Sequence, residues 1–360
     1  GGVRIQGTTG TVTVSGDKFR STLGLRSTLI TEIRQNVAVD PCAGTGAPTS
    51  GVSRHAGASR VETAVEVSKA NWPQGGSEDV LLATSQNFPD ALASASLAAA
   101  LDAPLLLTPT SSLAPAVEGE LARLGAKTVW ILGGTAAVSA GVEEELGDLG
   151  YDTRRVRGGN RFETARAIAL APEARQVGTV ALGMDQDWPS AATAGALATL
   201  PERIPTLLVH TDAVPEVTET TLAELGAREV ILVGGTGAIS ADVDQRLRDL
   251  GYQVRRLAGD SRYSTSSAVA GEVLAKLPAG QRTLVVATGN DFPDALAAGA
   301  LAARLDGPML LSPQCTLGDS PATSDFLTAN KARLDKAALV GGRAALSDRV
   351  MEQVAAGIGG

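Results

Sequence analysis

The chain has 360 residues, enough for two to four domains, and its 44% hydrophobic and 19% charged content excludes disorder as the main state. The formal net charge of −8 argues against nucleic acid as a partner. No apolar run approaches the ~20 residues of a membrane-spanning helix.

Residues 1–38 predict a short β segment. Val3–Gln6 and Thr11–Val14 alternate apolar and polar side chains around a Gly-rich turn, which is typical of a hairpin, and residues 17–23 could form one or two helical turns. Because a lone hairpin is marginal in water, we expect this segment to be the end of a domain that begins upstream, in a longer protein. Residues 39–53 have the Gly- and Pro-rich composition of a linker.

From residue 54 onward the sequence repeats three times. Three markers recur in the same order with a period close to 101 residues, which is too long for a solenoid repeat and suits a small domain. The expected domains are 54–155, 156–256 and 257–360. The markers are Arg60–Ala64, Arg161–Ala165 and Arg262–Ser266; Asn87–Ala91, Asp187–Ala191 and Asp291–Ala295; and Leu132–Thr135, Val233–Thr236 and Val340–Arg343.

Each repeat alternates helices of 10–14 residues with short apolar strands. This pattern predicts an α/β module with a mainly parallel sheet covered on both faces. In the first repeat we expect helices over 59–71, 89–101, 115–124 and 139–149, and strands over 79–84, 104–107, 127–132 and 151–156.

The Arg of the first marker is the most informative position. Ser59 with Glu62 has the spacing of a capping box, which places Arg60 and its counterparts Arg161 and Arg262 at the first helical residue. A cation there opposes the helix dipole, so a compensating anion is expected. Two interpretations stay open at this point: a ligand anion held by the Arg and the helix amides, or internal salt bridges to Asp90 and Asp294.

No catalytic, metal or cofactor site is predicted. Cys42, His55, His210 and Cys315 are scattered, so a structural zinc site is not expected, and both histidines read as structural or incidental. Asp90 and Asp294 follow Pro in a helical first turn, where an acid is favoured for structural reasons, and no second acid recurs beside them. The Gly-Gly turns lack the fingerprint of a nucleotide-binding loop.

These motifs resemble the cell wall binding repeat 2 family of Gram-positive surface proteins, over residues 54–360. The resemblance is carried by Arg60–Ala64 and Arg161–Ala165, by Phe-Pro-Asp-Ala-Leu at 88–92 and 292–296, and by the Gly-Gly turns. It extends to a strand motif, Pro-Ile-Leu-Leu in its typical form, at 104–107, 205–208 and 308–311.

The resemblance implies three Toprim-like modules packed about a pseudo-threefold axis. It also implies non-covalent attachment of a secreted, wall-associated protein to an anionic wall polymer. The ligand-binding residues expected on this basis are Arg60, Arg161, Arg262, Pro104, Leu105, Pro205 and Pro308. The second repeat departs from the pattern with Trp188-Pro189-Ser190, and the third has Ser264 where Glu is usual, so the three sites are not expected to be equivalent.

Residues 14–28 resemble the closing stretch of the stage II sporulation protein D, or amidase-enhancer, domain, whose family acts on peptidoglycan. The acidic residue that this family uses would lie upstream of Gly1. An alternative function is therefore part of a peptidoglycan-remodelling enzyme with its catalytic residues upstream. An enzyme site within the repeats is disfavoured because the strand exits are poor in acids and differ between units.

The two cysteines form a candidate disulfide. A cell-surface protein has no reducing pool to protect free thiols, and Cys315 lies in a loop of the third repeat that is longer than its counterpart in the first. We expect this loop to reach Cys42 in the linker.

Overall fold

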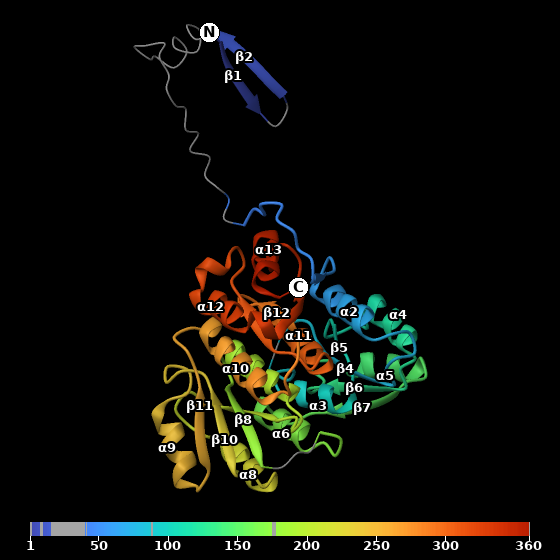
Figure 1. Cartoon of the computed structure of the whole chain (residues 1–360). Coiled ribbons are helices and arrows are strands. Elements are labelled where there is room, and N and C mark those ends of the chain that lie inside the picture. The colour runs from blue at the N-terminus through green and yellow to red at the C-terminus, as the bar shows by residue number, and fades with distance from the viewer. Residues whose placement is uncertain are drawn as a thin grey trace. The chain divides into compact units, whose positions relative to one another are not determined.

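The computed structural model describes residues 2–7, 10–15, 40, 42–87, 89–174 and 178–359. The chain divides into two units, Gly1–Asp40 and Pro41–Gly360 (Figure 1). In the first unit, strands β1 (Gly2–Gly7) and β2 (Gly10–Ser15) pair antiparallel with Gly2 opposite Ser15, which confirms the predicted hairpin. The predicted helical turns at 17–23 lie outside the described residues.

The second unit contains three four-stranded sheets whose strands are all parallel. We call the three sheets with their helices modules 1, 2 and 3. The predicted α/β class and parallel sheets are therefore confirmed.

Module 1 has the sheet order β5-β4-β6-β7. Its elements are α2 (Arg60–Asn71), β4 (Asp79–Thr84), α3 (Ala95–Leu101), β5 (Leu105–Thr108), α4 (Pro115–Leu124), β6 (Thr128–Leu132), α5 (Ala140–Asp148) and β7 (Asp152–Val156). The helix expected from residue 89 begins only at Ala95, and residues 89–94 form turns.

Module 2 repeats this order as β9-β8-β10-β11. Its elements are α6 (Arg161–Ala169), β8 (Thr179–Met184), α7 (Trp188–Gly195), the 3-10 helix η1 (Ala196–Thr199), β9 (Thr206–Val209), α8 (Glu216–Glu224), β10 (Glu229–Val233), α9 (Ala241–Asp249) and β11 (Gln253–Leu257).

Module 3 has the order β13-β12-β14-β3. Its elements are α10 (Arg262–Lys276), β12 (Arg282–Thr288), α11 (Phe292–Arg304), β13 (Met309–Ser312), η2 (Leu317–Asp319), α12 (Pro321–Asn330), η3 (Lys331–Arg333), β14 (Leu334–Val340), α13 (Asp348–Gly357) and β3 (Val52–His55).

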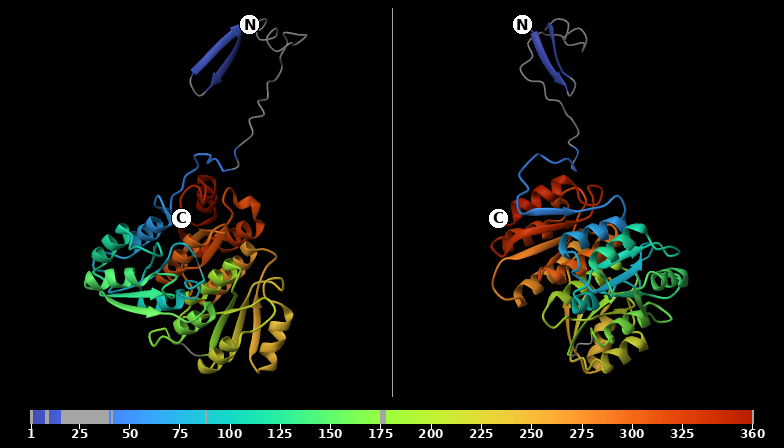
Figure 2. Two further views of the ribbon diagram at one scale, coloured as in Figure 1. Left: turned by 180° about the vertical axis from the view of Figure 1, so that it is seen from behind. Right: turned by 90° about the vertical axis from the view of Figure 1, so that its right-hand side faces the viewer.

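The fourth strand of each sheet comes from the segment that precedes a repeat, and β3 thereby joins the start of the chain's first repeat to module 3, so that the three modules form a ring. β7 and β11 lead into the next repeat but pair with the sheet of the preceding one. The equivalent strand before the first repeat, β3, pairs with β14 of module 3, nearly 300 residues away, so the blue and red segments lie side by side (Figure 2). Val52 and Ser53, expected in a linker, therefore belong to the last sheet.

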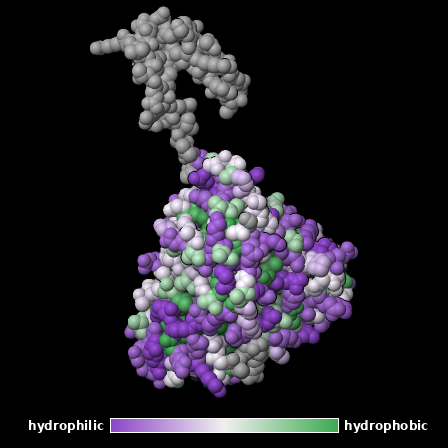
Figure 3. Space-filling view, in the orientation of Figure 1, coloured by the Kyte–Doolittle hydropathy of each residue, from purple (hydrophilic) through white to green (hydrophobic). Residues whose placement is uncertain are grey.

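The modules meet through small side chains. Helices α3, η1 and α11, one from each module, pack against one another, and Ala95, Ala99, Ala198 and Ala303 form a shared apolar cluster between them. Gly195 faces the methyl group of Ala95, which a Cβ at Gly195 would approach to 3.2 Å. Such close helix packing requires Ala and Gly. The face shown in Figure 3 is largely hydrophilic, with apolar residues in small patches.

Candidate functional site

The three repeated arginines occupy the first residue of α2, α6 and α10, as predicted. Each helix has an N-cap side chain that accepts a backbone N–H of the first turn; the caps are Ser59, Asn160 and Ser261. The reciprocal capping box expected from Ser59 and Glu62 is found instead at Ser261 and Ser264, whose side chain accepts the Ser261 N–H at 2.9 Å.

A Gly–Thr hydrogen bond fixes the approach to each of these helices. The Thr of the repeated motif, four residues into the helix, accepts the N–H of a Gly three residues before the Arg, at 3.1 Å in all three modules. A Cβ on that Gly would lie within 2.1–2.3 Å of the residue at the Glu position of the motif. The Gly is therefore obligatory, and it holds the Arg in one place. The pairs are Gly57–Thr63, Gly158–Thr164 and Gly259–Thr265. Sequence analysis missed this role, although the Gly recurs at the same spacing.

Each Arg donates a hydrogen bond to a carbonyl just after the central strand of its own module. Arg60 Nη1 reaches Ser85 O at 2.9 Å, and Arg161 and Arg262 make the same contact at 2.7 and 2.6 Å with Asp185 O and Gly289 O. These carbonyl oxygens supply part of the negative charge that compensates for a cation at the N-terminus of a helix.

The other side of Arg60 and of Arg262 faces the preceding module in the ring. The Arg60 guanidinium lies 5.4 Å from the ring centre of Phe292 and 3.2 Å from the Asp291 carboxylate, both in module 3. Arg262 of module 3 lies 6.0 Å from the ring centre of Trp188 in module 2. The repeated Arg and the repeated aromatic therefore meet at boundaries between modules.

The internal salt bridges differ from those considered in the sequence. Arg60 pairs with Asp291 rather than Asp90 or Asp294, and the carboxylate nearest Arg161 is that of Asp185, at 3.7 Å. Within the described part of the chain, Arg262 has no carboxylate within 4.0 Å. The acidic partners were not predictable from the spacing of the motifs. Asp291 reaches Arg60 from another module, and Asp185 reaches Arg161 from the end of a strand.

The acid of the Phe-Pro-Asp motif lies over the Gly-Gly turn of its own module. A Cβ on Gly133 or Gly341 would lie 2.5 Å from Oδ2 of Asp90 or Asp294, respectively, and both glycines have a positive φ. Burial and the neighbouring Asp291 raise the pKa of Asp294 to about 6, against the opposing effect of Arg60. The acids therefore have the structural role expected from the sequence. Their close approach explains why the turn needs Gly.

A second repeated arginine donates hydrogen bonds to backbone carbonyls of each Gly-Gly turn. Arg155 donates to the carbonyls of Gly133 and Val138 at 3.0 and 2.9 Å and pairs with Glu143, and its side chain is only 9% exposed. Arg54 and Arg256 make matching contacts in modules 3 and 2. Burial lowers the pKa of both, against the opposing effect of their Asp partners. Sequence analysis missed this series, although its 101-residue period was visible.

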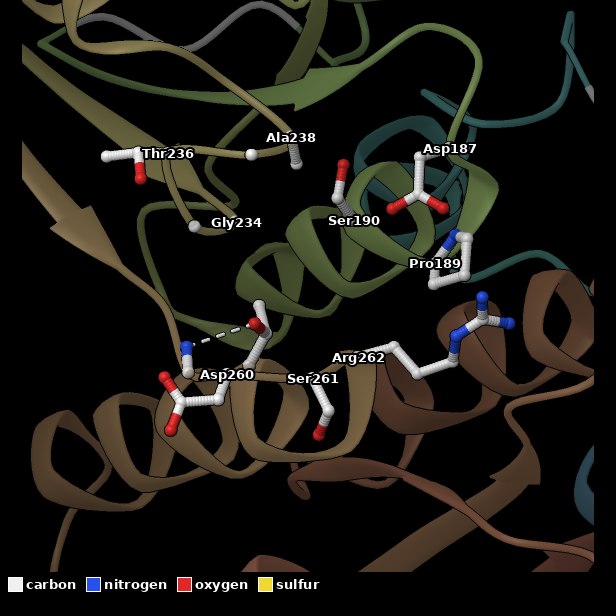
Figure 4. Close-up of a pocket in the computed structure, with 13 residues that line it drawn as sticks. Asp187, Pro189, Ser190, Gly234, Thr236, Ala238, Asp260, Ser261 and Arg262 are labelled. Carbon is white, nitrogen blue, oxygen red and sulfur yellow. Dashed lines mark hydrogen bonds between the residues drawn. The ribbon is translucent and has the colours of Figure 1, made fainter.

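A cleft lies at the boundary between modules 2 and 3. It has a volume of about 360 Å³ and is lined by Ser190 and the 234–238 turn of module 2 and by Ser261 and Arg262 of module 3. Figure 4 shows the Ser190 side chain beside Asp187 and facing Ala238, with Arg262 below Pro189. Burial raises the pKa of Asp187, and Arg262 opposes this rise.

Module 2 also carries a polar cluster that its sisters lack. The buried Asp185 carboxylate lies 3.3 Å from His210 Nδ1, and the His210 ring packs edge-on against Phe162 at 4.7 Å between ring centres. Among the described residues no group of three or more His, Cys, Asp or Glu side chains is arranged to hold a metal ion.

The strand motif lies in the core. Pro104, Leu105, Pro205 and Pro308 are all buried. The three Pro carbonyls accept backbone N–H groups of the adjacent strands at 2.9–3.0 Å. Buried side chains cannot contact a polymer, so we assign these residues to the sheet rather than to a ligand surface. This corrects the expectation from the sequence.

The predicted disulfide between Cys42 and Cys315 is confirmed, with their Cα atoms 4.1 Å apart. Next to it, Glu352 accepts hydrogen bonds from the backbone N–H groups of Thr45, Gly46 and Ala47 at 2.7–3.2 Å, and these bonds lower its pKa. The segment after Cys42 is therefore held against module 3.

The fold defines a protein of three tandem α/β modules, with Arg60 and Arg262 at boundaries between modules. The family model described as Cell wall binding domain 2 (CWB2) matches residues 54–143, 155–244 and 256–351. The chain belongs to this family, and its three repeats are cell-wall-binding domains. Among the described residues, no helix has the length and apolarity needed to cross a membrane.

Two curated proteins of Bacillus subtilis are similar to most of the chain. The chain is 27% identical over 307 residues to the N-acetylmuramoyl-L-alanine amidase LytC of Bacillus subtilis, covering 84% of this chain and 58% of that protein. It is 27% identical over 289 residues to the amidase enhancer of the same organism, covering 80% and 38%. The chain thus spans less than two thirds of these relatives.

Two solved structures from Clostridium difficile share the fold. Cwp8 superposes with a TM-score of 0.72 at 30% identity, over 86% of this chain and 52% of that one. Cwp6 gives a TM-score of 0.78 at 23% identity, over 100% and 56%.

Proposed function

We propose that the three modules anchor a secreted protein non-covalently to the Gram-positive cell wall by binding an anionic secondary wall polymer. The observation that supports this most is the arginine at the ring's junctions. Arg60 and Arg262 are exposed and Arg161 is half-buried, so each guanidinium keeps a face toward solvent while its position is fixed by a carbonyl. Arg is the residue best suited to bidentate recognition of phosphate and carboxylate.

The negative net charge of the chain does not oppose this proposal. Charges are screened beyond ~8 Å at physiological ionic strength, so the local surroundings of each Arg decide whether an anion binds. Within the proposal the modules are Toprim-like and related by a pseudo-threefold axis, and this chain binds without catalysis or cofactor. The contacts of α3, η1 and α11 support such an axis.

The test is sedimentation with purified Gram-positive walls. The triple variant Arg60→Ala, Arg161→Ala, Arg262→Ala should no longer sediment with the walls, while its circular dichroism spectrum and melting temperature stay close to wild type. Walls stripped of secondary polymers by hydrofluoric acid should not bind the wild type. A folded triple variant that binds normally would exclude the arginines as contacts.

A second candidate role concerns the longer protein. The two curated relatives are an amidase and an amidase enhancer, and this chain covers only part of each. Together with the resemblance of residues 14–28, this favours an upstream domain that remodels peptidoglycan and binds it as its substrate. Muralytic activity of the full-length protein, absent from residues 42–360 alone, would support it.

A further inference from the structure

The acid that lies over the Gly-Gly turn in modules 1 and 3 has no counterpart in module 2. In module 1 the Asp90 carboxylate fills the space over Gly133, and in module 3 the Asp294 carboxylate fills the space over Gly341. In these two modules the position over the turn is therefore occupied by a carboxylate of the protein itself.

Between modules 2 and 3 the corresponding residue is Ser190. Its hydroxyl turns inward to accept the Met184 N–H at 2.9 Å, so no carboxylate stands over Gly234, and a cavity of about 360 Å³ opens there. This volume is at the small end of the ~300–1,000 Å³ typical of ligand pockets, which suits one charged unit of a polymer.

Of the three repeated arginines, Arg262 is the one with no carboxylate within 4.0 Å among the described residues, although its charge acts on Asp187 in the same cleft. Arg60 has Asp291 at 3.2 Å and Arg161 has Asp185 at 3.7 Å. In the part of the chain that the structure describes, Arg262 makes no ion pair; its hydrogen bond goes to the Gly289 carbonyl. The absence of a carboxylate over Gly234 is a sequence difference, Ser190 for Asp, whereas the lack of a close ion pair at Arg262 is a difference in geometry; both fall on the same cleft.

We infer that the cleft between modules 2 and 3 is the junction that takes an acidic group of the wall polymer, with Arg262 as its cationic contact. In modules 1 and 3 the matching position already holds a carboxylate of the protein itself. This inference rests on the proposed function and narrows it to one of three sites. Asp187 and Asp260 also line the cleft: Asp260 lies on the side opposite the Arg262 guanidinium, and Asp187 lies on the same side as Arg262, near Pro189 (Figure 4). The acidic group would therefore bind to Arg262 in competition with Asp187.

The test is sedimentation of the full chain with purified Gram-positive walls, using paired variants. Ser190→Asp installs the carboxylate of the sister modules and should weaken binding roughly tenfold or more, because its negative charge repels the acidic group. Arg262→Gln should weaken binding by a similar factor, because it removes the charge-assisted contact. The matched controls are Ser190→Ala, which keeps the cavity uncharged, and Arg154→Gln, at a half-exposed side chain outside the cleft; both should bind within about twofold of wild type. Arg60→Gln, whose guanidinium is paired with Asp291, should weaken binding less than Arg262→Gln. Melting temperatures establish that each variant is folded.

The outcomes separate the two claims. If the wild type binds walls and Arg262→Gln binds equally well, or if Arg60→Gln loses as much as Arg262→Gln, the single-site inference is wrong and the proposed function stands. If the wild type does not bind walls, or binds hydrofluoric-acid-stripped walls equally well, the proposed function fails and takes this inference with it. Should Ser190→Asp not fold, the comparison of Arg262→Gln with Arg60→Gln still decides.

Discussion

Asp294 carries an ionisation that works against folding at neutral pH. Its carboxylate lies in the first turn of α11 against Gly341, where burial and the negative charge of Asp291 raise its pKa from the ordinary value of 3.8 to about 6. A folded-state pKa above the unfolded one means that the folded protein binds the proton more tightly. The protonated form is therefore the stabilising one, and this contribution is lost as the pH rises from about 4 through about 6.

The size of the effect follows from the same values. The difference between 3.8 and about 6 corresponds to at most about 3 kcal/mol of unfolding free energy at neutral pH. Asp294→Asn removes the charge but keeps the shape, so at about pH 7.5 the variant should be more stable than wild type by roughly 1–3 kcal/mol. Near pH 4 the two proteins should differ little, because the wild-type carboxyl is then protonated.

Urea unfolding at several pH values between about 4 and 7.5 measures this difference. Subtracting the wild-type free energy of unfolding from that of the variant at each pH cancels the contributions of all other titrating groups. Asp260→Asn, at an exposed position, is the control for removing one negative charge from the surface. A destabilised Asp294→Asn protein at neutral pH, or a difference that does not change with pH, would refute the reasoning and show that the ionised carboxylate is needed in place.

Three further results are expected. Arg155→Ala should lower the free energy of unfolding by roughly 2–4 kcal/mol, since it strands buried carbonyls, whereas Arg154→Ala, at a half-exposed side chain, should cost under about 1 kcal/mol; equal costs in urea unfolding would contradict the structural role of Arg155. Thiol titration should find no free thiol before reduction, and reducing Cys42–Cys315 should cost up to about 5 kcal/mol, because the bond closes 273 residues. Deleting residues 1–56 removes β3 and exposes the edge of β14, so gel filtration should show association; deleting residues 1–40 leaves β3 in place and should not.

The repeats made most of the local structure predictable. Alternating helical and strand patterns gave the elements of module 1 to within a residue or two, except for the start of α3. The capping residues placed Arg60, Arg161 and Arg262 at helix starts, because N-cap chemistry acts within one turn and leaves its mark in adjacent residues. The pair Cys42 and Cys315 was predictable for another reason: the chain offers only two cysteines and one lengthened loop.

What only the tertiary structure decided are the contacts that cross from one module to the next. The partner of Arg60 is Asp291, and the fourth strand of module 3 is β3; both pairs are more than 200 residues apart and follow from ring closure, which local patterns do not encode. Pro104 and its equivalents looked like ligand contacts because they recur, but recurrence marks core packing as readily as binding. Ser190 and Arg262 line one cleft, and this cleft exists only once modules 2 and 3 are packed against each other.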